Sequence, residues 1–132
     1  MNWKKGSCHC QKIQFEVFDS FKKATICDCS ICNMKGFIHL IVKKENFKLT
    51  TNTQELSNYQ FGTKTAKHLF CPNCGISSYY APRSHPDGYS VNLRCIEDID
   101  ISSPELINFE GKKWEENIAI LKNHLDEVKD LK

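Results

Sequence analysis

The sequence predicts a mainly β fold, in which small antiparallel sheets are organised around two zinc sites and are followed by a C-terminal α-helix. Three observations lead to this fold class: short apolar segments with the period of a strand, turn-forming residues between them, and eight cysteines gathered in groups. A chain of 132 residues buries about two-thirds of the surface that it exposes when unfolded. We therefore expect a single domain over residues 1–132.

Seven short segments favour strands. In residues 12–18, Ile13, Phe15 and Val17 alternate with polar neighbours, which is the pattern of a half-buried strand. The further candidates are residues 37–42, 46–50, 58–61, 66–70, 77–80 and 89–94. Turn-forming residues separate them at 50–55, 61–64, 71–75 and 83–88.

The C-terminal segment has a different period. Apolar residues recur there at spacings of four and three, which places them on one face of an amphipathic helix over about residues 113–130. They are Trp114, Ile118, Leu121, Leu125 and Val128. Such a helix can dock on the sheet or pair with a second copy in a homodimer, and a pattern this short does not choose between the two.

Charge and hydropathy exclude some classes of partner and indicate a compartment. The formal net charge is +2, with lysines and acidic residues interspersed, so no basic arm for nucleic acid and no polybasic membrane patch is present. No apolar stretch has the length of a signal peptide or of a membrane span. We expect a cytoplasmic or also nuclear protein, where thiols stay reduced and clustered cysteines indicate metal ligands.

The first candidate metal site combines two cysteine pairs. Residues 70–75, "FCPNCG", have the form of a zinc knuckle, in which Cys71 and Cys74 face one metal and Gly75 allows the chain to turn away. A closed tetrahedral site needs a second pair, and "CHC" at residues 8–10 supplies Cys8 and Cys10. These four thiolates predict a structural zinc that closes a long loop, with His9 as a neighbour of the site.

The second candidate metal site has only three evident ligands. Cys27, Cys29 and Cys32 form a C-x-C-x-x-C triplet, and three protein ligands with an open fourth position are typical of catalytic zinc. A substrate thiol would complete such a soft site. The alternatives are that Cys95 closes the site as an inert cage, that Cys95 only packs in the core, or that the ligands pair differently.

These motifs together resemble a known family. "GSCHCQKIQFEV", "CDCSICNMKG", "FCPNCGISSYYAPRS" and "YSVNLRCIED" occur in the order and spacing typical of the glutathione-dependent formaldehyde-activating enzymes, whose fold is called Mss4-like. Within that family, "DCSIC", "YYAPRSHPDG" and "FEGKKWEE" are similar to centromere protein V and its animal relatives. The family usually has glycine where this chain has Gln11, so we expect a different turn after the first cysteine pair.

The resemblance implies two zinc ions per chain and a carbon–sulfur lyase activity. Cys8, Cys10, Cys71 and Cys74 would be structural, and Cys27, Cys29 and Cys32 would hold the zinc at which glutathione and formaldehyde form S-hydroxymethylglutathione. Two zinc ions and seven thiolates would bring the formal charge from +2 to about −1. The family often has a cysteine at the position of Cys95, which places that residue near the second zinc.

Other side chains are candidates for the remaining steps. His39 follows the triplet and could transfer a proton to or from the alkoxide, or be a structural strand histidine. Arg83 and Arg94 could bind the carboxylates of glutathione, and His85 is expected in a turn.

Two non-catalytic alternatives stay open. The likeness to centromere protein V suggests a zinc-bearing interaction module for a protein partner, associated with chromosomes or microtubules. The name of the fold alone suggests a chaperone or nucleotide-exchange module.

Overall fold

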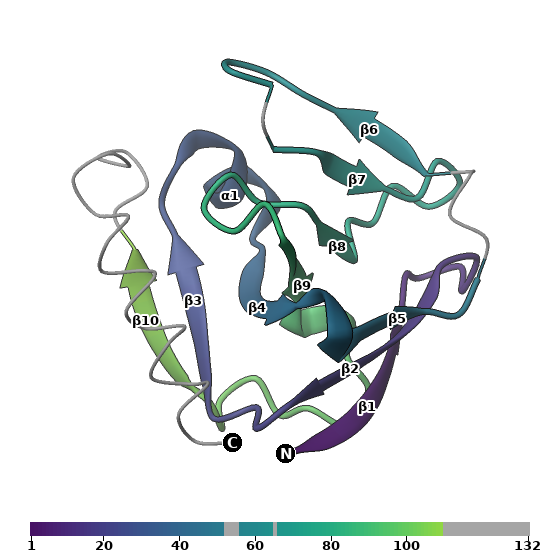
Figure 1. The fold of residues 1–132 in the computed structure, drawn as a ribbon, viewed down its shortest axis with the longest axis vertical. Helices are drawn as coiled ribbons and strands as arrows, with labels where there is room; N and C mark the ends of the chain where they lie inside the picture. The colour runs from purple at the N-terminus through teal and green to yellow at the C-terminus, as the bar shows by residue number, and fades with distance from the viewer. Residues whose placement is uncertain (52–55, 65, 110–132) are drawn as a thin grey trace.

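The computed structural model describes residues 1–51, 56–64 and 66–109, and these form three small sheets (Figure 1). The first sheet contains three strands, in the order β1 (Asn2–Ser7), β2 (Gln14–Asp19) and β5 (Phe47–Leu49). The second has five, in the order β10 (Glu105–Phe109), β3 (Lys23–Cys27), β4 (Ile38–Lys43), β9 (Gly88–Asn92) and β8 (Tyr79–Tyr80). The third is the pair β6 (Ser57–Tyr59) and β7 (His68–Phe70). The prediction of a mainly β fold is confirmed.

Helical structure is short in the described ranges. The helix α1 (Ser30–Lys35) is six residues long, and the one-turn helices η1 (Lys44–Asn46) and η3 (Leu93–Cys95) follow strands. No helix in these ranges is long and apolar enough to cross a membrane. The helix expected over residues 113–130 lies outside the described residues.

The core lies between the first two sheets. Alternation in β2 points Phe15 and Val17 inward, and both are almost completely buried. The ring of Phe15 stacks on Phe47 of β5 with centroids 5.5 Å apart, and Phe47 contacts Tyr79 of β8 at 4.7 Å. These contacts join the three-stranded sheet to the five-stranded sheet through aromatic side chains.

The five-stranded sheet has two faces with different residues, because successive side chains on a strand point to opposite sides. One face belongs to the core and carries Ala24, Leu40, Val42, Tyr79 and Val91. The strand registers place a second set on the other face: Thr25, Cys27, His39, Ile41, Tyr80, Ser90 and Phe109. This second face combines polar and metal-ligating residues with aromatic ones.

The pair β6–β7 stands beside this second face. An isolated bridge between Lys67 and Ala81 joins it to the end of β8, with backbone hydrogen bonds of 3.0 and 3.2 Å in the two directions. In Figure 1 the pair lies next to β8, across from the three-stranded sheet. Side chains of β7 and of the β6–β7 turn can therefore reach the polar face of the five-stranded sheet.

Candidate metal centres

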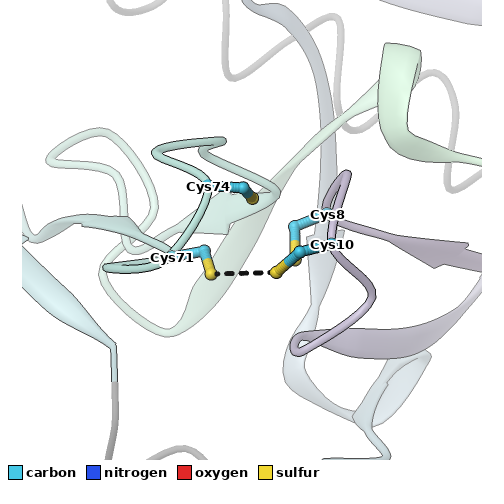
Figure 2. Close-up of side chains that lie close together, drawn as sticks. All are labelled: Cys8, Cys10, Cys71 and Cys74. Carbon is cyan, nitrogen blue, oxygen red and sulfur yellow. Dashed lines mark hydrogen bonds between the residues drawn. The ribbon is translucent and has the colours of Figure 1, made fainter.

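The first cluster joins the N-terminal part of the chain to its middle. Cys8 and Cys10 follow β1, Cys71 and Cys74 follow β7, and Figure 2 shows the two pairs facing each other. The sulfur of Cys10 lies 3.7 Å from the sulfur of Cys8 and 3.7 Å from that of Cys71 (Figure 2). Zinc–sulfur bonds of about 2.3 Å in a regular tetrahedron place two sulfurs about 3.8 Å apart. The donor set therefore fits a zinc ion.

Each pair is held by a tight turn of the backbone. The N–H of Gly75 donates to the carbonyl of Cys71 at 2.8 Å, and Gly75 has φ +78°. In the other pair, the N–H of Gln11 donates to the carbonyl of Cys8 at 3.1 Å, and Gln11 has φ +65°. Gln11 thus adopts the left-handed conformation that glycine prefers.

The second cluster is local in sequence. Cys27 ends β3, Cys29 is the residue before the first turn of α1, and Cys32 lies on α1 with its side chain buried. The three sulfurs lie within 4.8 Å of one another, which brings the predicted triplet together. The N–H of Asp28 donates to the carbonyl of Phe109 on β10 at 3.2 Å and so fixes the segment between Cys27 and Cys29.

The pKa values of the three thiols of this triplet shift in opposite directions. Hydrogen bonds with Cys27 and Cys32 hold the pKa of Cys29 far below its ordinary value. The contact with Cys29 raises the pKa of Cys27, and contacts with both other thiols raise that of Cys32. A triplet that stabilises thiolate fits a soft divalent metal such as zinc.

A cavity of about 460 Å³ opens above the triplet, on the second face of the five-stranded sheet. The sulfur cluster forms one part of its lining, and strands β3, β4 and β8 supply Thr25, His39 and Tyr80. The opposite wall comes from the β6–β7 turn and from β7, with Phe61 and His68. A volume of this size can hold an organic ligand.

His39 is a buried polar residue in the lining of this cavity. Its Nδ1 lies 2.8 Å from the Ser90 hydroxyl and 3.2 Å from the Tyr80 hydroxyl. These two hydroxyl groups fix the orientation of the ring. Nε2 on the other edge is buried and has no hydrogen-bond partner within the described ranges. Burial lowers the pKa of His39 to about 4, against the opposing effect of the Cys29 charge, so the ring is neutral at neutral pH.

The other predicted site residues are placed as follows. Arg83 lines the cavity, whereas Arg94 is exposed on η3 and is not part of its lining. His85 lies in a turn in which its carbonyl accepts from the N–H of Gly88 at 3.0 Å. His9 is exposed beside the first cluster.

Cys95 is not brought to the triplet. It ends η3 and is not in the cavity lining, and the charge of Cys74 contributes to raising its pKa, after burial as the main cause. Cys95 packs against the hydrophobic core, and its carbonyl oxygen lies beside Gly6, in the strand that leads to Cys8. The expectation that Cys95 lies near the second metal rested on its place in the sequence, which does not reveal on which side of the sheet a helical turn will put a side chain.

Sequence reasoning missed several residues of the cavity. His68, Phe61 and Tyr80 were interpreted only as members of strands or turns. Only the strand registers, which pair Ser90 with both Ile41 and Tyr80, reveal that Tyr80 shares the face of His39.

The fold and the two clusters define a small, mainly β protein with two candidate thiolate metal centres. A family model described as glutathione-dependent formaldehyde-activating enzyme matches residues 3–113. The chain belongs to this family.

Two relatives extend the comparison. A protein of Schizosaccharomyces pombe, named an uncharacterized lyase, is 22% identical over 95 residues, which are 72% of this chain and 69% of the relative. A crystal structure of a Rhodobacter sphaeroides protein aligns with a TM-score of 0.73 and 36% identity, covering 80% of this chain and 99% of the other. The description of the family names a glutathione-dependent enzyme, and the Schizosaccharomyces pombe relative is named a lyase.

Proposed function

We propose that this protein is a zinc-dependent carbon–sulfur lyase that joins a thiol such as glutathione to a small aldehyde, or cleaves the adduct. The observation that carries the proposal is a cavity lined by both the three-cysteine cluster and His39, whose buried Nε2 has no hydrogen-bond partner within the described residues. Family membership supports the same class of reaction.

The triplet Cys27, Cys29 and Cys32 would hold the catalytic zinc, and Cys8, Cys10, Cys71 and Cys74 the structural one. A zinc ion bound by three thiolates would keep a substrate thiol in its nucleophilic thiolate form. Arg83 lines the same cavity and would pair with a carboxylate of the thiol compound.

His39 would move the proton of the reaction. In the cleavage direction, the hydroxyl proton of the adduct passes to Nε2 while the carbonyl forms and the carbon–sulfur bond breaks, so the sulfur leaves as thiolate. The ring can take this proton because it starts neutral, and its Nδ1–H then donates to the hydroxyl oxygen of Ser90 or Tyr80. In the joining direction the same proton returns to the alkoxide oxygen.

Zinc content and sulfur coordination test the proposal. We expect two zinc ions per chain, and X-ray absorption should show one site change from three sulfurs to four when glutathione is added. Formation of S-hydroxymethylglutathione from glutathione and formaldehyde, followed by NMR, should be faster than the uncatalysed reaction. The proposal would be contradicted if the second site already has four sulfur ligands and its coordination does not change when glutathione is added.

Two variants separate the roles. Cys29→Ser should retain only the structural zinc and lose the response to glutathione. His39→Gln should retain both zinc ions and the sulfur response, but its turnover should fall by about 10²-fold or more, because the proton acceptor is removed. Normal turnover in His39→Gln would contradict the role of this residue.

A second candidate is a non-catalytic interaction module of the kind that the likeness to centromere protein V suggests. Large apolar side chains are exposed outside the cavity: Trp3 on β1 is 41% exposed, and Met34 on α1 is 87% exposed. For this function, Trp3→Ala or Met34→Ala should abolish capture of a protein partner while zinc content stays at two, and glutathione should have no effect.

A further inference from the structure

The ring of His68 is held in the wall of the cavity between two other rings. Tyr80 stacks on one face and Phe61 on the other, with ring centroids 4.9 Å and 5.4 Å away and interplanar angles of 21° and 20°. All three residues line the cavity. Because both faces of the imidazole are covered, a ligand in the cavity can reach His68 only at the edge of its ring, which carries the two nitrogen atoms.

This edge has no hydrogen-bond partner in the described part of the chain. The ring nitrogens of His68 make no hydrogen bond with any residue that the structure describes. They are also not among the fully buried side-chain atoms that lack a partner there, which are Ser20 Oγ, His39 Nε2 and Ser78 Oγ. His68 as a whole is only 6% exposed and belongs to the cavity lining, so its accessible edge faces the cavity. A ligand there can supply the missing hydrogen bond.

His68 lies one ring away from the proposed proton-transfer residue. The ring of Tyr80 stacks on His68, and its hydroxyl lies 3.2 Å from Nδ1 of His39. The charge of the Cys29 thiolate raises the pKa of both histidines, against the larger effect of burial, so both lie near the triplet. On the other side of His68, Phe61 is 46% exposed and marks the outer end of this wall. His68 therefore lies beside the part of the thiol compound that does not react.

The imidazole of His68 is suited to a neutral partner. Burial lowers its pKa below the ordinary value, and the charge of Lys35 lowers it further, so the ring is neutral at neutral pH. A neutral imidazole has one N–H donor and one acceptor nitrogen. An amide has both an N–H and a carbonyl, so it can pair with either tautomer of the ring. A carboxylate is matched instead by the cation in the same lining, Arg83.

We propose that His68 is a specificity-determining residue that forms a hydrogen bond with an amide group close to the substrate sulfur, so that the site favours thiols with a peptide bond over simple thiols. This inference rests on the proposed function and narrows the class of its thiol substrate. Tyr80 and Phe61 are positioning residues in this arrangement, because they fix the plane of the His68 ring.

The test compares two thiols that differ by one amide group. N-acetylcysteine and 3-mercaptopropionate share the thiol, the carbon chain and the carboxylate, and only the first carries an acetamido group. Both thus offer the same groups to the metal cluster and to Arg83. Binding of each to the zinc-loaded protein is measured by calorimetry, with glutathione as the reference, so the result does not depend on turnover. We expect N-acetylcysteine to bind about three- to tenfold more tightly than 3-mercaptopropionate.

Two variants show whether His68 causes this preference. His68→Phe keeps a ring between Tyr80 and Phe61 but removes both nitrogens. Its affinity for N-acetylcysteine should fall by about three- to tenfold, whereas its affinity for 3-mercaptopropionate should not change. His85→Phe is the matched control, because His85 lies in a turn and does not line the cavity. This control should keep the wild-type preference.

A spectroscopic measurement on the wild-type protein does not depend on the folding of any variant. Nitrogen NMR of isotope-labelled histidine follows the ring nitrogens of His68 directly. Addition of N-acetylcysteine should shift these signals, because a hydrogen bond forms at the ring edge, and addition of 3-mercaptopropionate should shift them much less. Equal shifts with the two thiols would contradict the proposed hydrogen bond.

The possible results separate this proposal from the lyase proposal. Equal binding of the two test thiols to the wild type, or a preference that persists in His68→Phe, would overturn the role of His68. The lyase proposal would then still stand on its zinc and formaldehyde measurements. Failure of glutathione and of both test thiols to bind would overturn both proposals.

Discussion

Gln11 and Gly75 turn the chain away from the two halves of the four-cysteine cluster with nearly the same backbone dihedral. Their φ values are +65° and +78°. A non-glycine residue in this conformation is strained by about 1–2 kcal/mol, because its Cβ approaches the following carbonyl oxygen. We therefore expect Gln11→Gly to raise the free energy of unfolding by about 0.5–1 kcal/mol, after subtraction of glycine's larger unfolded-state entropy.

Chemical denaturation at saturating zinc measures this effect. The complementary variant is Gly75→Ala, in which the free energy of unfolding should fall by about 1 kcal/mol. A Cβ at Gly75 would meet no atom within 4 Å, so the loss would come from the backbone conformation alone. A stabilised Gly75→Ala protein would contradict the explanation.

His39 makes stability depend on pH. Burial lowers its pKa in the folded protein to about 4, whereas an unfolded histidine titrates near pH 6.5. Between these values the unfolded state binds one proton more than the folded state, so stability falls as the pH falls from about 6.5 to 4. The expected slope from this residue is about 1.4 kcal/mol per pH unit.

The difference between wild type and His39→Gln isolates this contribution, because loss of zinc in acid is common to both. Unfolding free energies measured from pH 7 to pH 4.5 should fall less steeply in the variant. Parallel pH profiles for the two proteins would show that His39 does not titrate as its burial requires.

At the scale of residues, the sequence predicted which cysteines lie together, but it did not predict the residues that surround them. Closely spaced cysteines reveal their pairing because C-x-C and C-x-x-C force the sulfurs together. The sequence does not reveal that Ser90 and Tyr80 orient His39, because these contacts depend on strand register between segments 41 to 51 residues apart.

At the scale of elements, all seven expected strands are present, and β1, β3 and β10 were missed. The reason is visible in their burial. β1 and β10 are edge strands with mostly exposed side chains, so they lack the alternation that marks β2. β3 is interior, but its five residues "KATIC" offer only a short apolar run. The helix α1, which carries Cys32, has only six residues, too few to show a helical period.

The pairing of β1 with β2 depends on the absence of a side chain at Gly6. Gly6 faces Phe15 in the register, and a Cβ there would lie 2.3 Å from the Phe15 ring and 2.8 Å from the carbonyl oxygen of Cys95. We expect Gly6→Ala to destabilise the protein by about 1–3 kcal/mol through overpacking. Thermal unfolding measures this destabilisation, and Lys5→Ala is the control on the same strand. A normal melting temperature in Gly6→Ala would show that β1 can shift.

At the scale of the molecule, the two clusters should affect stability differently. Cys71→Ser breaks a cluster that joins Cys8 and Cys10 to the middle of the chain, so loss of this zinc should also lower stability by several kcal/mol. Cys29→Ser breaks a cluster confined to residues 27–32, so it should lose one zinc with a much smaller loss of stability. Metal analysis combined with circular dichroism measures both effects. Equal destabilisation by the two variants would contradict this division.

The difference in sequence span between the clusters also concerns biosynthesis. The ligands of the triplet are complete once Cys32 has left the ribosome, whereas the other cluster must wait for Cys74. The nascent chain therefore has its candidate catalytic ligands before the ligands that tie the domain together. During that interval the triplet faces cellular zinc donors without the finished cavity above it, so its metal would be acquired first and enclosed afterwards.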